Sequence, residues 1–176
     1  MPTAYIPGAL ARRFPEVCAL ADALASELRE LVLPWLGTSR SRELSGKSAG
    51  GDTTFAIDEL AEVRMEHILK ESGLPVAFYS EDRGLVSRPG AAWTFIVDPI
   101  DGTRPAAAGL EAACVSVAVA RAVVEPVMAD VDYAVVREIK EGGVFTAVRG
   151  QGVSARDNWG NPRPLVLSRN TDLSRL

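Results

Sequence analysis

The sequence predicts an α+β domain in which two N-terminal helices pack on a largely antiparallel sheet. Apolar residues recur at helical spacing in residues 17–35 and again in residues 57–69. Runs rich in β-branched and aromatic residues then follow one another with short links, a pattern typical of an antiparallel meander. The 176 residues, 47% hydrophobic and 24% charged, are enough for one soluble domain with a substantial core.

Composition excludes several classes of partner. With 19 basic and 23 acidic residues the net charge is -4, and no basic cluster is present to follow a nucleic-acid backbone. No stretch approaches the roughly 18 apolar residues of a membrane span, and the N-terminus lacks a signal-peptide pattern. Cys18 and Cys114 lie among apolar residues without a framework spacing, so we expect buried free thiols rather than a disulfide, and a cytoplasmic location.

The first helix is predicted from the apolar residues between Val17 and Trp35. Pro15 is placed near its start, Gly37 lies just past its end, and Pro34 should kink or end its last turn. Residues 37–51 are rich in Ser, Gly, Arg and Lys, which predicts a surface loop between helices.

The second helix covers residues 57–69, with Asp52 or one of the two threonines after it as cap and Gly73 as the stop signal. Asp58 falls in the first turn, where a carboxylate is favourable beside the helix dipole whether or not it has a function. His67 lies mid-helix between charged residues, which favours a surface position over a catalytic one.

The most informative stretch is 93–103, an apolar run that ends in two carboxylates, a glycine and a hydroxyl. Pro99 cannot donate a ladder hydrogen bond, so we expect the strand to stop at Asp98. A tight turn would bring Asp98 and Asp101 together, an arrangement that repels unless a cation lies between them, and oxygen ligands favour magnesium. The N–H groups of Gly102 and Thr103 could bind a phosphate at a following helical turn. The alternative is an ordinary Asp-Pro, Asp-Gly turn without a ligand.

Other strands are predicted on both sides of this stretch. A short strand at 76–79 is followed by a polar turn that contains Glu81 and Asp82. Downstream, residues 114–124, 126–136 and 143–148 read as strands, with a turn at 149–152.

The segment Asp98-Pro99-Ile100-Asp101-Gly102-Thr103 resembles the D-P-[IL]-D-G-T signature of the inositol monophosphatase superfamily of magnesium-dependent, lithium-sensitive phosphatases. Ser80-Glu81-Asp82 is similar to the family's acidic motif before that strand, with Asp in the second acidic place. The resemblance implies the first half of the family's αβαβα fold. It also implies hydrolysis of a phosphate monoester with Mg²⁺, or Mn²⁺ as a substitute.

The resemblance also implies roles for individual residues. The metal ligands would be Glu81, Asp98, the Ile100 carbonyl and Asp101. Thr103, with Glu81 or Asp58 behind it, would orient the attacking water, and the backbone of Gly102 and Thr103 would bind the phosphate.

Two positions further upstream complete the comparison. Lys47 matches a loop lysine that reaches toward the metals in the family, although a solvated loop lysine is the simpler interpretation. Asp58 matches the family's acidic residue at the start of the second helix, and Asp52 is not favoured as a functional residue.

The chain also departs from the family pattern. After Thr103 the family continues with one residue, an Asn and an aromatic, whereas this chain has Arg104-Pro105-Ala106. The Trp-Asp motif of the family's second domain is not found, so we expect residues 1–176 to form a single N-terminal domain without the C-terminal one. The function expected is an incomplete magnesium-dependent phosphatase acting on a small phosphorylated metabolite. The alternatives are a metal- or phosphate-binding half-domain with little turnover, or a half-domain for association, and in each case a homodimer is expected.

Overall fold

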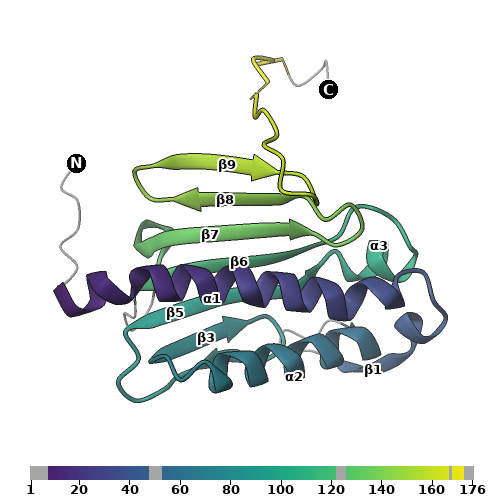
Figure 1. Cartoon of the computed structure of the whole chain (residues 1–176). Coiled ribbons are helices and arrows are strands. Elements are labelled where there is room, and N and C mark those ends of the chain that lie inside the picture. The colour runs from purple at the N-terminus through teal and green to yellow at the C-terminus, as the bar shows by residue number, and fades with distance from the viewer. Residues whose placement is uncertain (1–7, 48–52, 122–125, 167, 173–176) are drawn as a thin grey trace.

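The protein has one seven-stranded sheet with two long helices on one of its faces (Figure 1). The computed structural model describes residues 8–47, 53–121, 126–166 and 168–172. Its helices are α1 (Gly8–Val32), α2 (Ala56–Glu71) and α3 (Thr103–Ala107), with 3-10 helices at Leu33–Trp35, Arg40–Arg42 and Met128–Asp130. Its strands are β1 (Leu44–Lys47), β2 (Thr53–Phe55), β3 (Val76–Ser80), β4 (Gly84–Val86), β5 (Trp93–Asp101), β6 (Cys114–Arg121), β7 (Val131–Glu138), β8 (Val144–Val148) and β9 (Gly152–Arg156).

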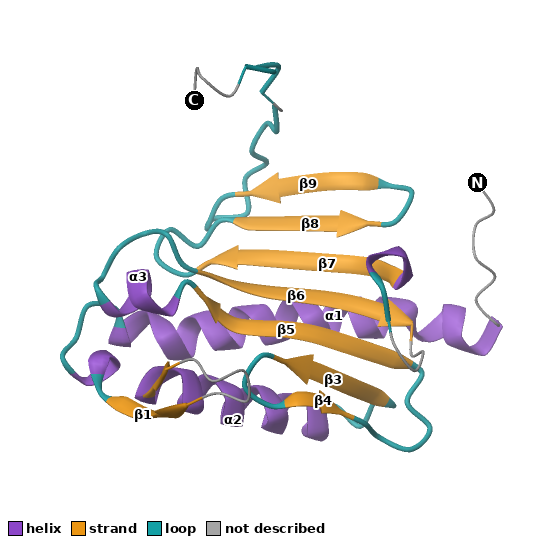
Figure 2. Cartoon of the chain, turned by 180° about the vertical axis from the view of Figure 1, so that it is seen from behind, coloured by secondary structure: helices purple, strands orange, loops and turns teal. Residues whose placement is uncertain are grey.

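The seven-stranded sheet has the order β4-β3-β5-β6-β7-β8-β9, and β1 and β2 form a separate antiparallel pair (Figure 2). The pairing of β3 with β5 is parallel, and every other pairing in the sheet is antiparallel. The predicted α+β class and the meander from β5 onward are therefore confirmed.

The core lies between the helices and one face of the sheet. α1 packs on β6 and β7, and α2 packs on α1 and β5. Leu24 and Leu28 of α1 are fully buried, as are Trp93 and Phe95 of β5. Full burial of each such side chain contributes about 1.5–3 kcal/mol. Because side chains alternate along a strand, Ile96 and its neighbours on the next strands point to the opposite face, which Figure 2 shows without a helix over it.

Several boundaries differ from the prediction. α1 begins at Gly8, so Pro15 lies inside the helix instead of at its start. The segment predicted as a loop contains a 3-10 helix and β1, which pairs with β2. The helix α2 begins after Phe55, whose N–H donates to the Asp58 carboxylate at 2.9 Å. Asp52 lies outside the described residues.

The prediction that the strand at 93–98 stops before Pro99 is wrong. β5 continues to Asp101, but its register against β6 shifts between Asp98 and Asp101. Pro99 falls in that irregular stretch, where its missing N–H leaves no regular ladder position unpaired. The short edge strands β4 and β9 were not predicted.

Both cysteines are free, and each is half-buried instead of fully buried as predicted. Cys18 lies on α1, and Cys114 begins β6 opposite Asp101. His67 is exposed on α2, which confirms its predicted surface position. In the described part of the chain, no helix combines the length and the apolar character needed to cross a membrane.

Candidate metal and phosphate site

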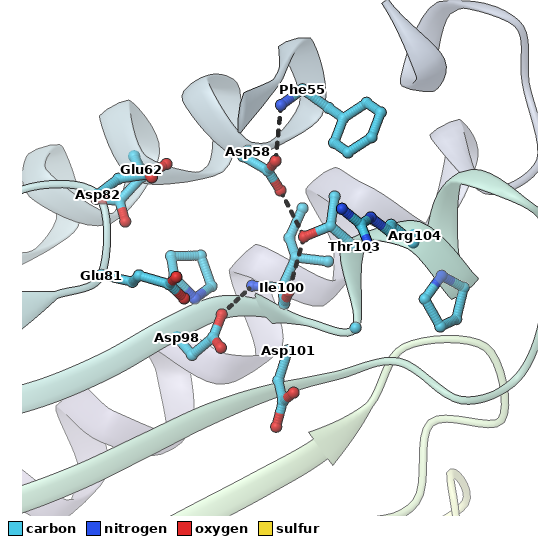
Figure 3. A pocket seen from close by; sticks show the side chains of 13 residues that line it. Phe55, Asp58, Glu62, Glu81, Asp82, Asp98, Ile100, Asp101, Thr103 and Arg104 are labelled. Atoms are coloured by element: carbon cyan, nitrogen blue, oxygen red, sulfur yellow. Dashed lines mark hydrogen bonds between the residues drawn. The ribbon is translucent and has the colours of Figure 1, made fainter. Parts of the chain in front are cut away.

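A polar pocket of about 400 Å³ opens where β5 ends (Figure 3). Its walls come from the N-terminal turn of α2, the turn after β3, the end of β5 and the start of α3. The lining residues are Phe55, Asp58, Glu62, Glu81, Asp82, Asp98, Pro99, Ile100, Asp101, Gly102, Thr103, Arg104 and Pro105. Six of them are acidic, so the pocket concentrates negative charge.

The irregular end of β5 places the two aspartates predicted from the sequence. The Asp98 carboxylate accepts a hydrogen bond from the Ile100 N–H at 3.1 Å, which closes a local turn around Pro99. Asp101 comes one residue later, paired with Cys114 of β6. The register of β5 against β6 shifts between these two residues, and Figure 3 shows their carboxylates at different places along the strand.

Gly102 makes the turn from β5 into α3. Its φ is +96°, a left-handed conformation that favours glycine. A Cβ at this position would lie 2.5 Å from the Ala112 carbonyl oxygen. Only glycine fits here without moving the backbone of a neighbouring segment. The helical turn that follows, at Thr103–Ala107, forms although Arg104 and Pro105 replace the residues common in the family.

Thr103 connects α3 to α2 through Asp58. The Thr103 hydroxyl lies 2.8 Å from Asp58 Oδ1 and 3.1 Å from the Ile100 carbonyl oxygen. Because a hydroxyl has one hydrogen, it donates to one of these two acceptors at a time. The other oxygen of Asp58 accepts the Phe55 N–H, so this carboxylate caps the helix and holds the threonine at once.

The turn that carries Glu81 is anchored to α2 by three side-chain contacts. The buried Glu62 carboxylate accepts a hydrogen bond from Ser80 Oγ at 2.9 Å. Arg83 forms ion pairs with Glu59 at 2.8 Å and Glu66 at 2.9 Å. These contacts fix the backbone on both sides of Glu81 and Asp82, whereas the Glu81 side chain itself is exposed.

Burial and like charge raise the proton affinity of the acids in the pocket. Burial, followed by repulsion from Asp101, raises the pKa of Asp98 to about 6. Burial also raises the pKa of Asp58, against the lowering effect of its hydrogen bonds from Phe55 and Thr103. Burial raises the pKa of Glu62 to about 7. Such crowding of carboxylates is characteristic of functional sites.

The structure gathers most of the residues singled out in the sequence. Asp58, Glu81, Asp98, Asp101 and the segment 100–103 all line the one pocket. Lys47 ends β1, but its side chain lies outside the described part of the chain.

The acidic side chains do not meet at one point. Across residues 8–47, 53–121, 126–166 and 168–172, no three histidine, cysteine or acidic side chains are arranged to hold a metal ion. Asp101 is turned toward the Cys114 thiol, at 3.8 Å, and Figure 3 shows its carboxylate pointing away from Asp58. Burial and repulsion from Asp101 raise the pKa of the Cys114 thiol to about 11.

The donor types nevertheless fit a hard divalent cation. Carboxylate oxygens and the Ile100 carbonyl are the ligands that Mg²⁺ prefers. Asp101 and Glu81 are exposed, so rotation about their side-chain torsions moves their carboxylates at low cost. Burial and repulsion from Asp101 raise the pKa of Asp98, and a cation beside this carboxylate would offset both effects.

Three lining residues were missed at the sequence level. Glu62 lies four residues after Asp58, which places both on the same face of α2, and this spacing is a signal that could have identified it. Arg104 directly follows Thr103 and brings a positive side chain to an otherwise acidic pocket. Phe55 forms part of the wall next to Asp58, and no sequence pattern indicated it.

Comparison with known proteins identifies the family. A sequence model described as the inositol monophosphatase family matches residues 15–176. The chain belongs to this family. Among curated relatives, a fructose-1,6-bisphosphatase/inositol-1-monophosphatase of Methanothermobacter thermautotrophicus is 31% identical over 142 residues, which cover 76% of this chain and 50% of the relative. A fructose-1,6-bisphosphatase of Pyrococcus furiosus is 29% identical over 133 residues, which cover 76% of this chain and 49% of the relative.

Solved structures of the inositol monophosphatase family share the fold. An inositol monophosphatase–fructose 1,6-bisphosphatase superposes with a TM-score of 0.66 at 23% identity, covering 89% of this chain and 62% of that one. The inositol monophosphatase of Thermotoga maritima superposes with a TM-score of 0.64 at 21% identity, and the match covers 90% of this chain and 56% of that one. The chain thus spans about half the length of the curated relatives it matches.

Proposed function

We propose that this family member is a magnesium-dependent phosphate monoester hydrolase whose reaction takes place in the pocket at the end of β5. Manganese is the expected substitute, and lithium the expected inhibitor. The observation that carries the proposal is that Asp58, Glu81, Asp98 and Asp101 line one pocket together with Thr103. Relatives that are named as phosphatases support the same reaction class.

The cation would be held by Glu81, Asp98, the Ile100 carbonyl and Asp101. When bound, it would supply charge stabilisation to the phosphoryl oxygens and acidify a water molecule. The exposed carboxylates of Glu81 and Asp101 would rotate toward Asp98, and the anchored turn after β3 would keep Glu81 within reach of it.

Thr103 would position the attacking water. Its hydroxyl oxygen can accept a hydrogen bond from the attacking water while its own hydrogen points to Asp58, at 2.8 Å. Asp58, fixed by the Phe55 N–H, thereby holds the hydroxyl in one orientation. The N–H groups of Gly102 and Thr103 would donate to the phosphate. Lys47, whose strand pairs with β2 just before α2, is proposed to approach the same pocket.

The substrate would be a small phosphorylated metabolite. Relatives are named for fructose 1,6-bisphosphate and inositol 1-phosphate, so phosphorylated sugars and cyclitols are the first compounds to assay. Phosphate release from such a panel, with and without Mg²⁺, tests the proposal. Release that persists in full without a divalent cation would contradict it.

A second candidate function is a metal- or phosphate-binding half-domain with little turnover. It is favoured by the acidic side chains, which do not converge in the described residues. A chain that binds Mg²⁺ but releases no phosphate from any panel member would have this function. We further propose that residues 1–176 form one domain, which predicts a single cooperative unfolding transition.

We also propose a homodimer located in the cytoplasm. The sheet face that Figure 2 shows without a helix carries the apolar Ile96, Ala118 and Ala134, and Tyr79 is exposed beside them. Such a surface supports self-association. Light scattering should return twice the chain mass of 18.8 kDa, and a mass of 18.8 kDa at all concentrations would contradict it. The two free thiols support a reducing compartment, which cell fractionation would test.

A further inference from the structure

A second polar cavity lies between α1 and strands β7 to β9, where the helix layer ends. α1 covers β6 and β7, and Figure 1 shows β8 and β9 beyond its edge. The cavity has a volume of about 410 Å³, which is within the range of small-molecule sites. We call it the α1–β9 recess. It is lined by Asp22, Ser26, Tyr133, Val135, Arg137, Val144, Thr146, Ser154, Arg156, Asp157, Asn158 and Gly160.

Strand register places two arginines on the floor of the recess. Arg137 of β7 pairs with Val144 of β8, which pairs with Arg156 of β9, and directly paired residues share a face of the sheet. The two arginines are two strands apart, about 10 Å between backbones. Side chains of this length can meet at one anion from that separation.

In the described part of the chain neither Arg137 nor Arg156 makes an ion pair, and Arg137 Nε is buried without a hydrogen-bond partner. A buried donor of this kind costs about 1–3 kcal/mol. Burial, and then the nearby Arg29, lower the pKa of Arg137, and the charges of Glu30 and Asp22 offset only part of this, so an anion in contact with the guanidinium would offset it further.

The two acids of the recess are already engaged. The Asp22 carboxylate accepts the Tyr133 hydroxyl. Asp157 accepts the N–H groups of Trp159 and Asn161, at 2.9 and 2.8 Å, and the Asn161 side-chain amide at 2.9 Å. Through these bonds the Asp157 carboxylate binds the loop that directly follows it, residues 159–161. Among the described residues, neither carboxylate forms an ion pair with Arg137 or Arg156, although the charge of Asp22 acts on Arg137 from a distance.

Hydroxyl groups complete the lining next to the arginines. Thr146 of β8 pairs with Ser154 of β9 in the row beside the arginine row, and their hydroxyl oxygens are 2.7 Å apart. Ser26 of α1 also lines the recess, but its hydroxyl donates to the Asp22 carbonyl oxygen of its own helix at 2.8 Å. Two guanidinium groups, with one hydroxyl of the Thr146–Ser154 pair left to donate, line one volume and match a tetrahedral oxyanion, which has several acceptor oxygens.

We propose that the α1–β9 recess binds the phosphoryl group of a small phosphorylated molecule between Arg137 and Arg156. The site is separate from the acidic pocket, shares none of its lining residues and needs no cation. The inference is therefore independent of the proposed hydrolysis, and either can fail alone.

The test is a titration of the full ¹⁵N-labelled chain with inorganic phosphate and with glycerol 3-phosphate in metal-free buffer, followed by NMR. We expect saturable shifts in residues 133–137 and 144–156, with a dissociation constant of about 1 mM. Arg137→Met and Arg156→Met should each weaken binding at least about 10-fold, since each removes a charged donor. Arg88→Met is the matched control, because this exposed arginine donates to the Leu74 carbonyl outside the recess, so its loss should leave binding unchanged.

Three results would overturn the proposal. Shifts that do not saturate, or that map to residues 98–103, would show that the recess is not the site. Equal binding by wild type and both arginine variants would do the same. Equally tight binding of acetate would show a general anion surface without phosphoryl preference. If Arg137→Met does not fold, the test is the phosphate affinity of Arg156→Met against that of wild type, because Arg156 is exposed on an edge strand.

Discussion

The Thr103 hydroxyl lies 2.8 Å from the Asp58 carboxylate, although the two residues are 45 positions apart in the chain. This contact joins the start of α3 to the start of α2 across the mouth of the acidic pocket. When the hydroxyl hydrogen points to Asp58 instead of the Ile100 carbonyl, the hydroxyl oxygen is free to accept a hydrogen bond from a water molecule.

The first prediction concerns this contact. Thr103→Val keeps the shape of the side chain but removes the hydroxyl, so phosphate release should fall about 100-fold. Loss of the hydrogen bond should also lower the free energy of unfolding by about 1 kcal/mol. Thr103→Ser restores the hydroxyl and should recover most of both. Activity of Thr103→Val equal to that of Thr103→Ser would remove the hydroxyl from the mechanism.

Gly102 provides a test of the turn that holds the site. Gly102→Ala should lower the free energy of unfolding by about 2–4 kcal/mol, because the new Cβ meets the Ala112 carbonyl in a left-handed conformation. The matched control is Gly90→Ala, which has a positive φ of 75° but nothing within 4 Å of its Cβ, and should cost only about 1 kcal/mol. Urea denaturation measures both, and equal losses would show that the close approach at Gly102 is absent.

The buried Glu62 predicts a pH dependence of the metal-free protein. Its pKa is raised from 4.5 to about 7, so the folded state holds this proton more tightly than the unfolded state does. The contribution of this protonation to the free energy of unfolding is fully present below about pH 4.5 and is lost as the pH rises through about 7. Glutamine does not titrate, so the free energy of unfolding of Glu62→Gln, relative to that of wild type, should be about 2–3 kcal/mol higher at pH 8 than at pH 5.

Urea denaturation at both pH values measures this difference. The exposed Glu71→Gln serves as the control and should follow the wild type. If the offset between Glu62→Gln and wild type is the same at pH 5 and pH 8, Glu62 does not titrate in this range.

Turnover by this chain should be slow. The described acidic side chains do not converge, so we expect loosely held cations and a rate well below the ordinary enzymatic value of about 10 per second. Phosphate release at saturating Mg²⁺ measures it. A rate at or above that value would mean that the ligand set already described is sufficient.

Much of the fold was predictable because it depends on local pattern. Helical spacing identified α1 and α2, and the apolar runs identified β3 and β5 to β8. The edge strands β4 and β9 are short, and their pairing depends on neighbours instead of on their own composition. Pro15 suggested a helix start, but α1 begins at Gly8, and Phe14 just before the proline packs against Trp93 of β5.

The candidate site was predictable only where its residues are contiguous. Residues 98–103 form a local pattern, whereas the contact of Ser80 with Glu62 and of Asp101 with Cys114 arises from tertiary packing. The arginines of the α1–β9 recess are brought together by strand register across three strands, which no single-sequence pattern contains.

The central claim is that the acidic pocket at the end of β5 binds a divalent cation, and calorimetric titration with MgCl₂ tests it most directly. Wild type should bind Mg²⁺ saturably, and Asp98→Asn should weaken the affinity at least about 10-fold, because it removes the most buried of the proposed carboxylate ligands. Glu71→Gln, on the exposed end of α2, should bind as wild type does. Equal Mg²⁺ affinity for wild type and Asp98→Asn would contradict the account.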